Sequence, residues 1–207
     1  PLAGRAEDLL VVYDRRRKDA ADATGRVAAL LRAARLAEVT LADRNRATQL
    51  LAQTVALAVR TPALFETIEP AVKAIGEDSP DLETPFVRAL VDVYAAIAED
   101  LDADPRGAAA LLGRASKLLE AQLGDLAQAY GALVRATSVA PFDDAAHDAL
   151  LALAQAMSKR PQLAAHLDRL VEEALDAKVA GSLLRRRAAL LCWCRTNALF
   201  FRRKRVL

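Results

Sequence analysis

The stretch LGDLAQAYGALVRATSVAPFDD, residues 123–144, contains the start, the apolar face and the end of one short helix. Asp125 stands where a side chain can accept hydrogen bonds from the first unpaired N–H groups, and Pro141 stands where a helix must stop. Between them, apolar residues recur at spacings of three and four, which places them on one face: Leu126, Ala129, Tyr130, Leu133, Ala136 and Ala140. The stretch predicts an amphipathic helix that packs against a neighbour.

The same pattern occurs 82 residues earlier, without a gap. The segment RAARLAEVTLADRNRATQLLAQTVALA (32–58) aligns with RASKLLEAQLGDLAQAYGALVRATSVA (114–140). The aligned identities include charged residues as well as Ala and Leu: Arg32 with Arg114, Leu36 with Leu118, Glu38 with Glu120, Asp43 with Asp125, and Leu51 with Leu133. Because a helix pair cannot bury its apolar face alone, this repeat predicts hairpins that stack against one another.

The composition of the chain favours an all-α protein. Of its 207 residues 54% are hydrophobic and only 4% are aromatic, and Ala and Leu, which lose least on entering a helix, dominate. Helical spacing along the chain predicts an N-terminal helix in 1–24, a first four-helix unit in 25–104 and a second in 105–179. Residues 180–207 are expected to begin a third repeat or to form an atypical C-terminal cap.

Several helix boundaries are predicted from local signals. A residue followed by a first-turn proline predicts helix starts at 61–62, 84–85, 104–105 and 160–161. Pro70 lies inside the expected helix 62–76 and should kink or split it, because proline removes a backbone hydrogen bond. The first helix is expected over 7–23 and to end near Gly25.

The order of small residues, leucine and proline in residues 124–141 resembles the second helix of a tetratricopeptide repeat. The residues that carry the resemblance are Gly124, Ala129, Leu133, Ala136 and Pro141, with Ala42, Ala47, Leu51 and Thr54 at the same spacing in the earlier copy. The resemblance covers residues 25–191, with motif support at 28–60 and 109–142. We expect the chain to be part of a longer array, and its richness in Ala and Arg to reflect a bacterial source. The resemblance implies an α-solenoid of stacked antiparallel hairpins and a non-catalytic scaffold that binds a protein or peptide on its concave face.

Five basic residues occupy corresponding places on the predicted first helices: Arg32, Arg35, Arg114, Lys117 and Arg186. In the family that the chain resembles, this helix lines the concave face. The row is therefore expected to bind acidic side chains or a peptide carboxylate through charge-assisted hydrogen bonds. The alternative is that these residues form ordinary surface ion pairs, since Arg35 and Lys117 lie three residues before Glu38 and Glu120.

No catalytic, cofactor or metal motif is found in the sequence, so we expect neither an enzyme nor a small-molecule substrate. His147 and His166 lie among Ala and Leu and are expected at the surface or its boundary. Cys192 and Cys194 would point about 200° apart on a helix, which argues against a shared metal. No run approaches the roughly 20 apolar residues of a membrane span, and a reduced, cytoplasmic setting is the default.

Charge is nearly balanced, with 29 Lys and Arg against 27 Asp and Glu, which gives no general electrostatic case for nucleic acid. Two basic runs, 15–18 and 202–205, keep open a second hypothesis: a compact helical bundle with a regulatory or nucleic-acid-associated role through its basic ends. The tail CWCRTNALFFRRKRVL (192–207) loses the acids of the repeat. It predicts either a changed reading frame or chain boundary, or a cap in which Trp193, Phe200 and Phe201 cover the last apolar face.

Overall fold

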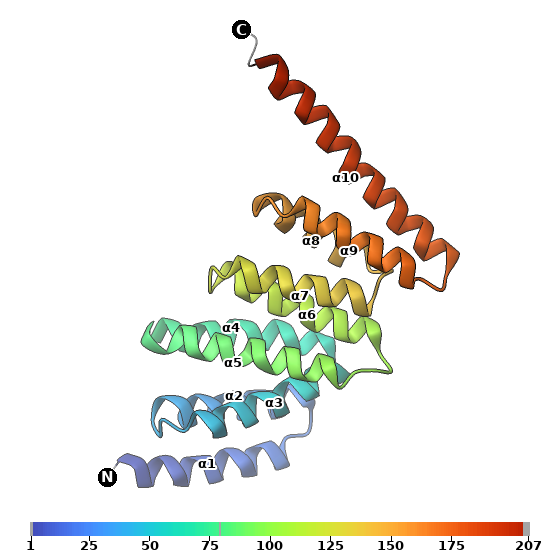
Figure 1. Ribbon diagram of the computed structural model, residues 1–207. Helices are drawn as coiled ribbons and strands as arrows, with labels where there is room; N and C mark the ends of the chain where they lie inside the picture. Colours follow the sequence, from blue (N-terminus) through green and yellow to red (C-terminus); the bar gives the residue numbers. More distant parts are fainter. Residues whose placement is uncertain (1, 79, 205–207) are drawn as a thin grey trace.

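The computed structural model is all-helical over the residues it describes, with ten α-helices, one short 3₁₀ turn and no strand (Figure 1). It describes the backbone of residues 2–78 and 80–204, and the side chains of residues 4–73 and 87–191. The elements are α1 (Leu2–Asp19), α2 (Ala23–Val39), α3 (Arg44–Arg60), η1 (Pro62–Leu64), α4 (Phe65–Asp78), α5 (Pro80–Glu99), α6 (Pro105–Ala121), α7 (Leu126–Val139), α8 (Asp144–Ala156), α9 (Arg160–Glu173) and α10 (Ala177–Lys204). The prediction of an all-α chain is confirmed.

The helices pack in adjacent pairs that form successive layers, α2–α3, α4–α5, α6–α7 and α8–α9, with α1 and α10 at opposite ends (Figure 1). Each helix contacts its neighbours in sequence, and α3 also contacts α5. The buried residues form one core that passes through the layers, with a fully buried side chain in many helices: Val27, Leu51, Leu90, Leu111 and Leu150. Each such side chain contributes about 1.5–3 kcal/mol relative to exposure, so packing between helices holds the layers together.

The connection between α2 and α3 is built in the same way as that between α6 and α7. The bounds of α2 and α6 differ by the same 82 residues at both ends. Asp43 accepts a hydrogen bond from the Arg46 N–H at 3.0 Å, and Asp125 accepts one from the Gln128 N–H at 3.0 Å. The residues before these caps, Ala42 and Gly124, both have left-handed backbone, with φ of 53° and 63°. The offset seen in the sequence is therefore also an offset between two equivalent helix pairs.

Three predicted boundaries differ from the structure. The first helix ends at Asp19 rather than near Gly25, because Asp22 caps the next helix by accepting from the Gly25 N–H at 2.7 Å. The start expected at 84–85 is wrong, since α5 begins at Pro80 and contains both residues. Pro70 does not split its helix: α4 continues to Asp78, and Pro70 is exposed, where water can hydrate the carbonyl group that lost its partner.

The start at Asp104–Pro105 is confirmed, with the Asp104 side chain accepting from the Gly107 N–H at 2.9 Å. Pro62 opens the 3₁₀ turn η1, and Pro161 lies in the first turn of α9. The hypotheses on Cys192, Cys194 and the C-terminal tail fall outside the described side chains, although α10 continues as a helix to Lys204. No helix among the described residues has the length and apolar character to cross a membrane.

Candidate functional site

The five basic residues of the predicted row lie on three helices. Arg32 and Arg35 are exposed on α2, Lys117 is exposed on α6, and Arg114 and Arg186 are half-buried on α6 and α10. Neither Arg32 nor Lys117 forms an ion pair with a described side chain, so the expected pair between Lys117 and Glu120 is not formed. Glu38 is bound by Arg44, whose guanidinium donates to it at 3.2 Å.

Arg114 connects α6 to the preceding layer. Its guanidinium donates to the Glu69 carboxylate at 2.8 Å, lies 3.6 Å from Glu66, and stacks 4.4 Å from the ring centre of Phe65. The Tyr94 hydroxyl donates to the same Glu69 oxygen at 3.3 Å, and its ring meets Phe65 edge-on at 5.8 Å. Burial, and then the charge of Glu69, raise the pKa of Tyr94, so its hydroxyl stays protonated. This contact is a filled, aromatic interface between layers.

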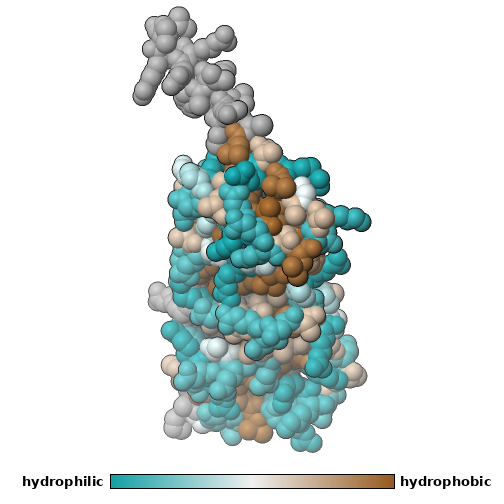
Figure 2. Space-filling model, turned by 45° about the vertical axis from the view of Figure 1, so that its right-hand side comes forward, coloured by the Kyte–Doolittle hydropathy of each residue, from teal (hydrophilic) through white to brown (hydrophobic). Residues whose placement is uncertain are grey.

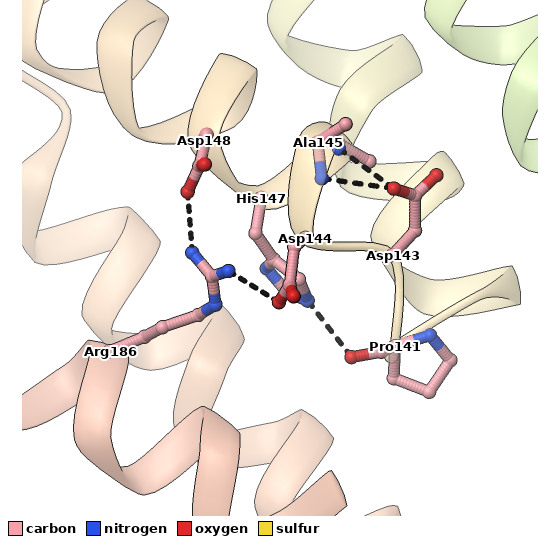
Figure 3. A network of polar contacts seen from close by, with 8 residues as sticks. Pro141, Asp143, Asp144, Ala145, His147, Asp148 and Arg186 are labelled. Atoms are coloured by element: carbon pink, nitrogen blue, oxygen red, sulfur yellow. Dashed lines mark hydrogen bonds and ion pairs between the residues drawn. The ribbon is translucent and has the colours of Figure 1, made fainter.

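Arg186 makes the corresponding connection from α10 to α8 (Figure 3). Its two terminal nitrogens donate to Asp144 at 2.6 Å and to Asp148 at 2.7 Å. The hydrogen bond and positive charge of Arg186 hold the pKa of Asp144 below its usual value. Both aspartate side chains are more than two-thirds exposed, at 77% and 71%, whereas that of Arg186 is 24% exposed. The ion pairs therefore close one edge of this contact without filling it.

A groove of about 280 Å³ opens beside Arg186, between α8, α9 and α10. Its lining is mostly aliphatic, with one imidazole, one amide and one guanidinium: His147, Leu151, Gln155, Leu163, Leu167, Arg186, Ala189 and Leu190. Apolar side chains are exposed near the top of the described surface in Figure 2. The groove combines a mainly apolar lining with three polar side chains, as binding sites for apolar anchors do.

Three positions that line the groove differ from their counterparts around Arg114. Residues of α4 correspond to residues of α8 at the 82-residue offset. Residues of α6 correspond to residues of α10 at an offset of 72, because this offset aligns the capping residues Asp104 and Asp176. Phe65 is then replaced by His147, Glu69 by Leu151, and Lys117 by Ala189. His147 has a smaller ring than Phe65, and Leu151 and Ala189 carry no charge, so the stacked ring and the partly buried ion pair of the earlier contact have no counterpart beside Arg186.

Both histidines are buried, at 4% and 6% exposure, so the prediction that they lie at the surface or its boundary is wrong. The Nε2 atom of His147 lies 3.1 Å from the Pro141 carbonyl, to which it donates. The Nδ1 atom of His166 accepts from Arg169 at 3.1 Å, so its Nε2–H donates to the Thr137 hydroxyl at 2.8 Å. The two imidazoles thus form hydrogen bonds at buried positions, which the apolar pattern of the sequence around them did not indicate.

Burial and positive neighbours keep both imidazoles neutral. Burial, followed by the charge of Arg169, lowers the pKa of His166 to about 4. Burial also lowers the pKa of His147, and the hydrogen bond to Pro141 only partly opposes this. No cluster of His, Cys, Asp and Glu among the described residues could hold a metal ion.

A wider, more open depression lies between α1, α2 and α3 and carries several basic side chains. It has a volume of about 750 Å³ and is lined by Arg17, Lys18, Arg26, Leu30, Gln53, Ala56, Leu57 and Arg60. Arg17 and Lys18 are already paired with Asp14, at 2.6 and 2.7 Å. Part of the N-terminal basic run is thus neutralised within α1, and the run at 202–205 lies outside the described side chains.

No protein-family model matches the chain, and no similar protein is found among curated proteins or solved structures. Evidence for function therefore comes from the geometry of the described residues.

Proposed function

We propose that this chain is a tetratricopeptide-like α-solenoid segment and acts as a non-catalytic scaffold for a protein or peptide partner. The observation that carries the proposal is the apolar groove between α8, α9 and α10. Its volume of about 280 Å³ suits one or two anchoring side chains of a peptide. Four leucines supply its walls, and the rim donors Arg186 and Gln155 can bind carbonyl or carboxylate oxygens of the ligand backbone.

The proposed solenoid is supported by the equivalence of the α2–α3 and α6–α7 pairs and by contacts that run mainly between neighbours along the chain. A closed bundle would instead bring α1 and α10 together. Small-angle X-ray scattering distinguishes the two, because a globular chain of this length has a radius of gyration of about 17 Å. We expect a larger value; a value at or below this one would reject the extended array.

The groove is tested with a random peptide library displayed on phage and selected against the whole chain. We expect enriched peptides to carry a Leu, Phe or Trp anchor and to lose binding to Ala189→Lys, which places at the groove the residue found at the equivalent position 117. The matched control is Ala152→Lys, which changes an exposed alanine of α8 outside the groove lining. Peptides that bind the Ala189→Lys protein equally well, or the absence of enrichment, would reject the groove as the site.

The exposed members of the basic row extend the proposed site toward acidic partners. Arg114 and Arg186 are already bound to acids of this chain, so reversing their charge would also weaken contacts between layers. Lys117→Glu tests the row more cleanly, because Lys117 is exposed and unpaired among the described side chains. We expect weaker binding of acidic peptides and an unchanged helical circular-dichroism signal, whereas unaltered binding would remove Lys117 from the site.

The alternative is a regulatory or nucleic-acid-associated role through the basic ends. The depression lined by Arg17, Lys18, Arg26 and Arg60 favours it. Binding through phosphates falls steeply with salt. A fluorescent single-stranded oligonucleotide that binds with a steep salt dependence and is released by Arg26→Glu with Arg60→Glu would support this role over peptide recognition.

A further inference from the structure

The last described helix exposes a face that its counterpart buries. At the 72-residue offset, Leu184 and Leu191 of α10 correspond to Leu112 and Leu119 of α6. Leu112 and Leu119 are 2% and 3% exposed in the pair with α7, whereas Leu184 and Leu191 are 50% and 45% exposed. Leu183 and Leu190, which correspond to Leu111 and Leu118, remain buried. Thus α10 packs on the preceding layer as α6 does, but the face that a following helix would cover is open.

The first helix, α1, also exposes apolar residues that its counterpart buries, but at the other end of the chain of layers. The α1–α2 connection has the same length as the α9–α10 connection, and an aspartate, Asp22 or Asp176, caps the second helix in each case. In this alignment Leu9 and Val12 correspond to Leu163 and His166. The two α9 residues are 3% and 6% exposed against α7 and α8, but Leu9 and Val12 are 45% and 44% exposed. The helix α1 therefore resembles the second helix of a pair, with the face that a first helix would cover exposed to solvent.

We propose that α1 of a second copy of this chain docks on the open face of α10 and completes a helix pair there. The order α9–α10 of one copy followed by α1–α2 of the next would then reproduce the order α5–α6–α7–α8 within a single chain. Leu184 and Leu191 would pack against Leu9 and Val12, so four large exposed side chains leave water together. Complementary faces at opposite ends (Figure 1) make this a heterologous contact that does not close, and copies add end to end.

Sedimentation velocity of the whole chain tests the proposal. We expect the average mass to rise with concentration without reaching a defined oligomer. Leu184→Asp with Leu191→Asp blocks the α10 end, and Leu9→Asp with Val12→Asp blocks the α1 end. Each double variant alone should be monomeric, because the contact needs one end of each kind. Mixed together, the two variants should form a 1:1 dimer that cannot grow, since each partner keeps one intact face.

The substituted residues are exposed, so the variants should keep the helical circular-dichroism signal of the unchanged chain. Leu126→Asp is the matched control: it also removes an exposed leucine, 37% exposed, but at the first position of α7, and the mass distribution should stay as in the unchanged chain. A monomer at all concentrations, a monomeric mixture of the two blocked variants, or dimers of either variant alone would overturn the head-to-tail contact. The last result would indicate a symmetric contact instead.

Discussion

The contacts at Arg114 and Arg186 each place an arginine at an equivalent position, but the residues around the two guanidinium groups differ. At Arg114 the guanidinium stacks on Phe65 and binds Glu69, which Tyr94 also binds. At Arg186 two exposed aspartates hold the guanidinium, and an apolar groove opens beside it. The arginine thus joins layers in both places, while its neighbours decide whether the space is filled or left available to a ligand.

The largest expected difference is in the free energy of unfolding lost when Phe65 or its counterpart His147 is replaced by alanine. Phe65→Ala should lower the free energy of unfolding by about 3–4 kcal/mol, because it empties a buried site and removes the ring that Arg114 and Tyr94 both contact. His147→Ala should cost about 1–2 kcal/mol, since it removes a smaller ring and one hydrogen bond. Urea unfolding measures both. Equal losses would mean that the groove is as tightly packed as the aromatic contact.

Acid should weaken the histidine-containing layer and spare the aromatic one. The pKa of His166 is about 4 in the folded chain and about 6.5 when unfolded, so the unfolded state binds more protons between these values. Stability is therefore fully present above pH 6.5 and falls by up to about 3 kcal/mol toward pH 4. Hydrogen exchange should show α7 to α9 losing protection first. In His166→Gln this selective loss should become smaller, and only the part that His147 contributes should remain, because burial lowers the pKa of His147 as well. An undiminished loss would assign it to groups other than His166.

A smaller effect is expected from removing the arginines themselves. Arg114→Met should cost about 1–2 kcal/mol, because the Glu69 carboxylate loses the guanidinium that binds it at a partly buried site and keeps only the Tyr94 hydroxyl. Arg186→Met should cost less, and high salt should reduce its effect further, because its aspartate partners are exposed and screened. Thermal unfolding at low and high salt compares the two. A larger or salt-independent loss at Arg186 would contradict this ranking.

Helix identity and the repeated pair could be read from the sequence because they depend on spacing and on caps close in sequence, such as Asp104 and Asp125. The acidic partners of the two arginines could not be predicted from the sequence, since Glu69 lies 45 residues from Arg114 and Asp144 lies 42 residues from Arg186. The groove was missed because Leu151, Leu163 and Leu190 have the spacing of ordinary core residues. The signal was present in the alignment of layers, where Ala189 and Leu151 replace charged residues.

The error at 84–85 has a different cause. A proline after a capping residue is common in a first turn, but Pro80 supplies the same signal four residues before Thr84, and the helix begins there. Local preference cannot choose between two such starts, because both proline positions satisfy the same first-turn rule. The division into units 25–104 and 105–179 stays a prediction.

The left-handed residue before Asp43 has a mechanical consequence. Ala42 holds a backbone conformation that costs a residue with a side chain about 1–2 kcal/mol, whereas Gly124 holds it at the equivalent turn without that penalty. If the protein is pulled from its two ends, the α2–α3 turn begins under strain, and that hairpin should yield at a lower force than α6–α7. Replacement of Ala42 by Gly would bring the two rupture forces closer together in an optical trap, so one methyl group sets which of these two hairpins opens first.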